Sequence, residues 1–342
     1  MIQNVAVIGA GSWGTALASV LADNGHQVTL WVRDPKQAEA ITTTHRNEKY
    51  LPGAELSARI AATSDMRAAV SEKPVVLLAV PSHAMRQICR DLAPSLASDV
   101  LLIHAVKGFE LGTLKRMSEV IQEELPFEIS SRLAVISGPS HAEEVVRRQP
   151  TTVVVASESE SSMHRSQDLL MNQNFRVYTN PDLIGAEIAG ALKNIIALGA
   201  GMSDGLGFGD NAKAALLTRG LAEISRLGLK LGAMPPTFAG LAGIGDLVAT
   251  CTSKHSRNWR AGFLLGQGKK LEDVLQEIGM VVEGVRTTQA ADVLAKREDV
   301  EMPITHVLYG ILFEGKDPRQ GVEQLMGRLK TYETEYLNPN DV

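Results

Sequence analysis

Short, almost continuous apolar runs recur through the first half of the chain, and helix-favouring stretches separate them. Strands that are buried on both faces of a parallel sheet have this character. Strands alternating with helices in this way predict a doubly wound, mainly parallel α/β sheet. The predicted strands cover residues 5–8, 27–32, 74–80, 100–106, 133–136 and 151–156.

The pattern changes at Asn180-Pro181, and no strand is predicted from there to the end of the chain. We therefore expect an α/β domain over residues 1–180 and an all-α domain over residues 181–342, with the functional site between them. Residues from Leu337 onward resemble a loose tail. Helical runs cover residues 184–200, 212–227, 271–278 and 285–295, with glycine-rich breaks at 199–211 and 238–245.

A glycine motif follows the first predicted strand directly. Gly9, Gly11 and Gly14 form a G-x-G-x-x-G pattern, with Ser12 and Trp13 between the last two glycines, and a helix and a second strand come next. Glycine is needed where a pyrophosphate lies against the backbone at a helix N-terminus. The alternative is an ordinary tight turn, but the strand–helix–strand setting favours a Rossmann-like dinucleotide site.

Composition excludes several other classes of protein. The formal net charge of −5 and the pI near 5.9 offer no electrostatic attraction for nucleic acid or an anionic membrane. Two cysteines form neither a disulfide framework nor a metal cluster, and the scattered histidines have no metal-binding spacing. The first strand starts too early for a signal peptide, and no apolar run is long enough to span a bilayer. We expect a cytoplasmic protein that needs no metal.

The end of the second strand bears on which nicotinamide nucleotide is bound. Asp34 lies about twenty residues past the glycines, where an acid could bind the ribose. With Pro35 after it, however, Asp34 is better interpreted as the N-cap of the next helix. Arg33 would then face the ribose and pair with a 2′-phosphate, which favours NADP over NAD. A solvated Arg33 is the alternative.

Two candidate sites lie at strand ends in the first domain. Lys107, before Gly108, could hold an anionic substrate group, or it could be a solvated loop lysine. Gly138 to Glu143 could bind a phosphate or carboxylate through Ser140 and free N–H groups. The simpler interpretation of this second segment is a helix-capping turn with Ser140 as the cap.

Two more candidates lie in the helical domain. Lys193 interrupts an apolar run and is either an edge residue with an exposed amine or a partly buried amine with a lowered pKa, suited to general acid–base work. Asp246, in a glycine loop, could orient such a lysine or cap a helix. Ser256, Arg257 and Asn258 could together bind a dianionic phosphate.

Taken together, these segments resemble bacterial NAD(P)-dependent glycerol-3-phosphate dehydrogenases. The resemblance runs in order from about Val5 to Glu283. The helix bearing Lys193 and the Ser256-Arg257-Asn258 segment are specific to that family. His141 stands where an aromatic residue is expected, which puts nothing catalytic in doubt. The matching segments are GAGSWG, LAVPSH, AVKG, SGPSHA, EIAGALKN, AGIGDL, SRN and VVEG.

The resemblance implies hydride transfer between NADPH, or NADH, and C2 of dihydroxyacetone phosphate, giving sn-glycerol 3-phosphate for glycerophospholipid synthesis. Lys193 would be the proton acceptor in the oxidation direction, assisted by Asp246, and Lys107 would touch both cofactor and substrate. The substrate would be bound by Gly138, Ser140, Lys193, Asp246, Ser256, Arg257 and Asn258. The cofactor would be bound by Gly9, Gly11, Ser12, Trp13, Gly14, Arg33, Tyr50, Lys107, Ala142, Arg257, Val281 and Glu283.

Two other functions fit the sequence less well. A dehydrogenase of the same two-domain plan could act on a hydroxyacyl or 2-ketoacid substrate, but it would have no need of the Ser256-Arg257-Asn258 segment. A non-enzymatic NADPH sensor would leave Lys193 and Asp246 with structural roles only. A homodimer formed through the helical domain is a further expectation.

Overall fold

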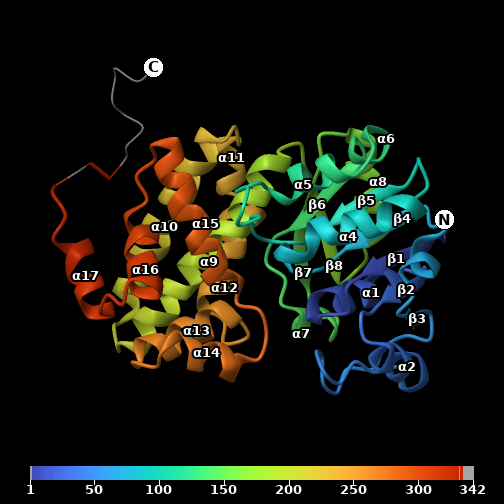
Figure 1. Cartoon of the computed structure of the whole chain (residues 1–342), viewed down its shortest axis with the longest axis horizontal. Coiled ribbons are helices and arrows are strands. Elements are labelled where there is room, and N and C mark those ends of the chain that lie inside the picture. The colour runs from blue at the N-terminus through green and yellow to red at the C-terminus, as the bar shows by residue number, and fades with distance from the viewer. Residues whose placement is uncertain (1, 331, 334–342) are drawn as a thin grey trace.

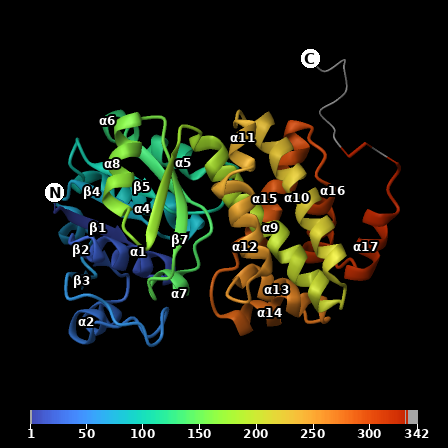
Figure 2. The same cartoon turned by 180° about the vertical axis from the view of Figure 1, so that it is seen from behind.

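The computed structural model describes residues 2–330, 332 and 333, and the expected tail from Leu337 lies outside them. An α/β domain with one sheet occupies the N-terminal half, and a bundle of helices follows it (Figures 1 and 2). The expected fold class, a Rossmann-like sheet followed by an all-α domain, is confirmed.

The sheet has eight strands in the order β3-β2-β1-β4-β5-β6-β7-β8. All neighbours pair in parallel except β6 and β7, which are antiparallel. The strand order reverses between β1 and β4, and ligands bind in the crevice at such a switch point. The strands are β1 Asn4–Ile8, β2 Gln27–Trp31, β3 Ile60–Thr63, β4 Val75–Leu78, β5 Leu101–His104, β6 Leu133–Ser137, β7 Thr151–Ala156 and β8 Phe175–Asn180.

Helices cover both faces of the sheet, because alternate residues of each strand point to opposite sides. Val5 and Val7 of β1 pack with α1, α2, α7 and α8, whereas Ala6 and Ile8 pack with α3 to α6. These helices are α1 Ser12–Asp23, α2 Pro35–Thr44, α3 Met66–Val70, α4 Met85–Leu92, α5 Met117–Glu124, α6 Phe127–Ser130, α7 Ala142–Val145 and α8 Glu160–Leu170, with 3₁₀ turns at Ser82–Ala84 and Ala93–Ser95.

The helical domain surrounds one central helix, α9, which most of the other helices contact (Figure 1). No strand occurs after Asn180 among the residues that the structure describes. The elements are α9 Leu183–Gly205, α10 Asp210–Lys230, α11 Pro235–Phe238, the π-helical turn η3 Leu241–Gly245, α12 Asp246–Thr252, α13 Arg257–Gly266, α14 Leu271–Ile278, α15 Glu283–Glu298, α16 Pro303–Phe313 and α17 Pro318–Met326.

Two strands were missing from the sequence prediction. Strand β3 has only four residues, and β8 alternates buried and exposed side chains at the edge of the sheet. Neither forms the continuous apolar run that identified the other strands. The sequence pattern therefore detected the centre of the sheet and missed its two edges.

The predicted break at 199–211 was partly wrong, because α9 continues to Gly205. Gly201 and Gly205 lie where α9 crosses α13, and a Cβ on Gly201 would overlap the backbone of Trp259. These glycines therefore permit close helix packing instead of ending the helix. The predicted break at 238–245 contains the π-helical turn η3.

The expectation that no apolar run is long enough to span a bilayer was wrong by length and composition, because α9 is; 94% of that stretch, however, is buried inside the molecule. The sequence analysis identified this segment only as an apolar run that Lys193 interrupts. In the structure α9 is buried nearly all round, as expected for the core helix of a bundle.

Candidate active site

The glycine loop lies at the switch point between β1 and β4. Gly9 has φ +110, and a Cβ there would lie 2.5 Å from the carbonyl oxygen of Ala79, directly after β4. A Cβ on Gly14 would overlap the carbonyl oxygen of Gly9, whereas Gly11 faces open space. The loop is therefore a turn that only glycine allows, with room in front of Gly11 for a ligand.

The start of α1 fits the pyrophosphate of a dinucleotide. Gly11 is the N-cap and contributes no side-chain cap, so the first backbone N–H groups of the helix are available to an anion. The indole Nε1 of Trp13 is buried without a hydrogen-bond partner. A buried donor of this kind is expected to find an acceptor when the ligand binds.

The residues expected at the adenosine end of the cofactor follow β2. Asp34 accepts a hydrogen bond from the Lys36 backbone at 3.0 Å and caps α2, with Pro35 as its first residue, so the capping interpretation is confirmed. Arg33 is exposed. The carbonyl of Tyr50 accepts a 2.9 Å hydrogen bond from Ser12, which brings the loop after α2 to the glycine motif.

Two lysines from different domains meet on one aspartate. Lys107, in the loop after β5, donates to Asp246 Oδ2 at 2.6 Å, and Lys193 of α9 donates to Asp246 Oδ1. Lys193 also donates to the hydroxyl of Thr250 at 2.7 Å. Lys193 and Asp246 are 6% and 1% exposed. Lys193 is thus a buried amine, and Asp246 begins α12 with its carboxylate turned to the lysines and not to a helix cap.

The electrostatics of this triad suit proton transfer. Burial lowers the pKa of Lys193 to about 8, helped by the charge of Lys107 and opposed by that of Asp246. Burial raises the pKa of Asp246, but the two lysines outweigh burial and leave it below its ordinary value. Lys193 can therefore exchange a proton near neutral pH, while Asp246 stays ionised.

The turn after β6 also lies beside Lys107. The carbonyl of Gly138 lies 3.4 Å from Lys107 Nζ, and the Ser140 hydroxyl donates to that carbonyl at 2.8 Å. Ser140 does not cap a helix, so that alternative was wrong. His141 is the N-cap of α7 and contributes no side-chain cap, and Ala142 is the buried first residue of the helix.

The predicted phosphate-binding segment forms the start of α13. The Ser256 hydroxyl caps this helix by accepting from the Trp259 backbone at 3.2 Å. Arg257 donates to the carbonyl of Val281 at 2.9 Å. Asn258 donates to Asn194 of α9 at 2.8 Å. The segment is therefore fixed to α9 one residue beyond Lys193.

Glu283, the first residue of α15, connects the two domains at a second point. Its carboxylate accepts from the backbone of Ser82 at 3.2 Å and from the Ser82 hydroxyl at 2.9 Å. The N–H of Gly284, the next residue, donates to Asn258 at 2.8 Å. The loop bearing Val281 and Glu283 thus links the Arg257 segment with the start of the helix after β4.

The sequence analysis missed Thr250 and Ser82 as partners of the site. Thr250 lies four residues after Asp246 on α12, one helical turn along. Its spacing from Asp246 was therefore the signal that could have identified it. No group of three metal-ligating side chains occurs in the part of the chain that the structure describes.

A Rossmann-like sheet followed by a helical domain, with a lysine from each domain on one aspartate, is the arrangement of a two-domain, nicotinamide-dependent dehydrogenase. Models of the N- and C-terminal domains of NAD-dependent glycerol-3-phosphate dehydrogenase match residues 4–163 and 182–323. The chain belongs to this family.

The relatives agree over nearly the whole length. The chain is 59% identical over 338 residues to glycerol-3-phosphate dehydrogenase [NAD(P)+] of Geobacillus kaustophilus, covering 98% of both chains. It is 56% identical over 336 residues to the protein of that name from Bacillus subtilis, covering 98% of this chain and 97% of the relative. The crystal structure of glycerol-3-phosphate dehydrogenase from Coxiella burnetii superposes with a TM-score of 0.91 at 39% identity, covering 96% and 99%.

Proposed function

We propose that this protein reduces dihydroxyacetone phosphate to sn-glycerol 3-phosphate with NADPH or NADH, reversibly, and so supplies the glycerol phosphate of phospholipids. The observation that carries the proposal is the meeting of Lys193 and Lys107 on Asp246 beside the carboxyl ends of the strands. The names of the relatives, at 56% and 59% identity, agree with it.

Lys193 is the proposed general acid of the reduction. Protonated Lys193 gives its proton to the carbonyl oxygen at C2, and neutral Lys193 takes the hydroxyl proton in the reverse direction. A bound reduced nicotinamide supplies the hydride. Asp246 holds the amine in place, and the charge of Lys107 stabilises negative charge on the oxygen as the C–O bond is polarised.

Binding of the substrate phosphate is assigned to Ser256, Arg257 and Asn258 at the start of α13, with Gly138 and Ser140 across the cleft. A guanidinium binds phosphate through two parallel hydrogen bonds, and a helix N-terminus favours an anion. Holding the phosphate orients C2, and binding energy remote from the reacting atoms can serve this purpose.

The expected cofactor residues are assigned to successive parts of the nucleotide. Gly9 to Gly14 would bind the pyrophosphate, with the Trp13 indole N–H as one donor. Arg33 and Tyr50 would lie at the adenosine end, and Ala142, Val281 and Glu283 would line the nucleotide with Lys107 and Arg257. Arg33 follows β2 directly, where a guanidinium can pair with a 2′-phosphate, so we propose a preference for NADPH.

The proposed reaction is tested by following reduced-nicotinamide absorbance with purified protein and dihydroxyacetone phosphate. Rapid loss with the phosphorylated ketone, and none with dihydroxyacetone, is the expected result. Repeating the assay with NADH, and with an Arg33→Ala variant, tests the preference for NADPH. Nucleotide binding without turnover of the phosphorylated ketone would favour a sensor or a different substrate.

Three further properties belong to the same proposal. We place the domain boundary at residues 180 and 181, between the end of β8 at Asn180 and the start of α9 at Leu183. We propose that the protein acts in the cytoplasm. We also propose a homodimer formed through the helical domain, where Met326 and Leu329 are 82% and 93% exposed beside an apolar groove of about 500 Å³ between α10, α16 and α17.

A further inference from the structure

Glu187 is a buried carboxylate to which the proposed reaction gives no task. It lies on α9, the helix that carries Lys193, and its side chain is only 4% exposed. A carboxylate this deeply buried is costly unless its charge is well paired. Its contacts show which parts of the two domains it joins.

The partners of Glu187 come from the sheet domain. The Ser118 backbone donates to Oε1 at 2.7 Å, and the Ser118 hydroxyl donates to Oε2 at 2.6 Å. The Arg116 guanidinium donates to Oε2 at 2.6 Å. His104 Nε2 lies 3.3 Å from Oε1. Burial raises the pKa of Glu187, but these contacts outweigh it and hold the pKa at about 2.

These contacts lie close to the reacting lysines in both domains. His104 is the last residue of β5, and Lys107 follows in the next loop. Gly190, three residues after Glu187, faces the same side of α9. A Cβ on Gly190 would lie 3.5 Å from the Lys107 side chain and 3.0 Å from the Ser137 hydroxyl. Helix α9 thus passes in contact with Lys107 just after Glu187.

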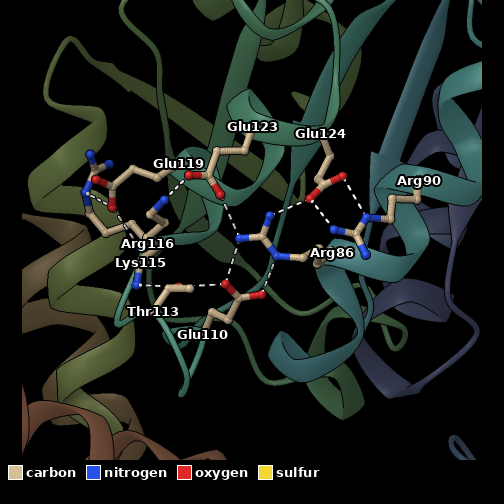
Figure 3. A network of polar contacts seen from close by, with 9 residues as sticks. All are labelled: Arg86, Arg90, Glu110, Thr113, Lys115, Arg116, Glu119, Glu123 and Glu124. Carbon is tan, nitrogen blue, oxygen red and sulfur yellow. Dashed lines mark hydrogen bonds and ion pairs between the residues drawn. The ribbon is translucent and has the colours of Figure 1, made fainter.

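The loop between β5 and α5 is also fixed by contacts within the sheet domain. Figure 3 shows Arg86 of α4 reaching Glu110 in this loop, with hydrogen bonds of 2.8 and 2.7 Å. The Arg116 backbone donates to Glu119 at 2.8 Å in the same network. Glu187 is therefore one contact from the helical domain to a loop that the sheet domain already fixes, in addition to the Lys107–Asp246 pair and the packing of Phe109 in the helical core.

Apolar packing brings the domains together but defines their relative position less sharply. Val135 of β6 packs with Ala186 of α9 and Ala242 of η3. Such contacts are non-directional, whereas the hydrogen bonds of a carboxylate require particular positions of their donors. Lys107–Asp246 and Ser82–Glu283 also join the domains by polar contacts, but those of Glu187 act on α9 itself and can set where this helix lies against the loop after β5.

We propose, on the basis of the function proposed above, that Glu187 is a positioning residue whose carboxylate fixes α9 against the start of α5 and the end of β5, so that Lys193 and Lys107 meet on Asp246. It touches none of these three groups itself. A displacement of about 1 Å at a reacting group can lower a rate about 10²-fold, so a contact outside the reaction centre can have a large effect on turnover.

The test replaces Glu187 by its neutral isostere. Glu187→Gln is expected to lower kcat for dihydroxyacetone phosphate by about tenfold or more, with the KM for NADPH changed less than about threefold, because the glycine loop is untouched. Hydrogen–deuterium exchange in residues 105–118 is expected to increase, because the Ser118 N–H loses its charged acceptor.

Asp182→Asn is the matched control. Asp182 is also a buried carboxylate at the start of α9. Its oxygens accept hydrogen bonds from the Gly185 and Met234 backbones at 2.8 Å and from the Thr237 hydroxyl, and all three donors lie in the helical domain. This variant is expected to lower the melting temperature while leaving kcat and exchange in residues 105–118 near their wild-type values.

Two results would overturn the positioning role: wild-type kcat and exchange in Glu187→Gln, or an equal fall in kcat in Asp182→Asn. A wild-type protein that does not turn over dihydroxyacetone phosphate would count against the proposed function alone. In that case, hydrogen–deuterium exchange in residues 105–118 of Glu187→Gln still decides whether Glu187 fixes the loop. Exchange equal to that of the wild-type protein would refute this role.

Discussion

At Lys193, burial and ion pairing act on the same amine in opposite directions. Burial lowers its pKa to about 8 even though Asp246 raises it. An exposed lysine would remain protonated far above neutral pH and would be a poor proton acceptor. The apolar α9 is therefore part of the chemistry, because it supplies the burial.

Lys193→Ala is expected to lower kcat by at least about 10²-fold, the usual contribution of a general acid or base. NADPH affinity, measured by fluorescence titration, should stay near the wild-type value, since the hydrogen-bond partners of Lys193 are Asp246 and Thr250 and not the glycine loop. Asp246 keeps Lys107 as its partner, so the variant should fold. Lys213→Ala, which removes a lysine paired with Asp204 in the helical domain, is the control. More than about a tenth of the wild-type rate would exclude the acid–base role.

The lowered pKa of Lys193 also predicts opposite pH dependences for the two directions. Reduction needs the protonated amine, so its kcat/KM should fall as pH rises through about 8. Oxidation needs the neutral amine and should rise over the same range. Steady-state rates between pH 6 and 10 test this. The same direction of change in both reactions would contradict it.

At the scale of single elements, the sequence predicted best what local chemistry determines. Asp34 and Pro35 favour a helix start through their own local chemistry, and the structure has that start. The edge strand β8 depends on pairing with β7, which no local pattern specifies. The length of α9 depends on its contact with α13, so its glycines resembled a break until their neighbours were known.

Gly201→Ala tests that contact between α9 and α13. Alanine favours a helix by up to about 1 kcal/mol over glycine. A Cβ here, however, would overlap the α13 backbone at Trp259, and overpacking costs about 1–3 kcal/mol or more. Because backbone must move, we expect net destabilisation, measured by urea unfolding. Gly112→Ala, where a Cβ meets nothing within 4 Å, should be nearly neutral. Equal stabilities would contradict close packing.

Considered as a whole, the molecule places its reacting groups in the contact between two domains. Lys107 comes from the sheet domain, and Asp246 comes from the helical domain. Ser82 and Glu283 join the domains at a second point. The sequence separately identified the members of the lysine–aspartate site, since each stands out in its own segment. It could not predict that Glu187 would face Arg116 and Ser118, because that contact exists only once the domains pack.

The proposed dimer makes a prediction at this scale. Light scattering should give twice the chain mass of 36.8 kDa for the wild-type protein. Replacing both Met326 and Leu329 by glutamate should give the monomer mass, because charges oppose burial of an apolar patch. A wild-type monomer, or a variant that remains dimeric, would contradict the proposed surface.

The most direct test of the central claim is to follow the hydride itself. The protein is incubated with dihydroxyacetone phosphate and NADPH that carries deuterium at both C4 positions of the nicotinamide ring, and the product is analysed by mass spectrometry and NMR. Our account predicts one deuterium at C2 of glycerol 3-phosphate, with the phosphate retained. Deuterium at another carbon, or oxidation of NADPH without a labelled product, would contradict it.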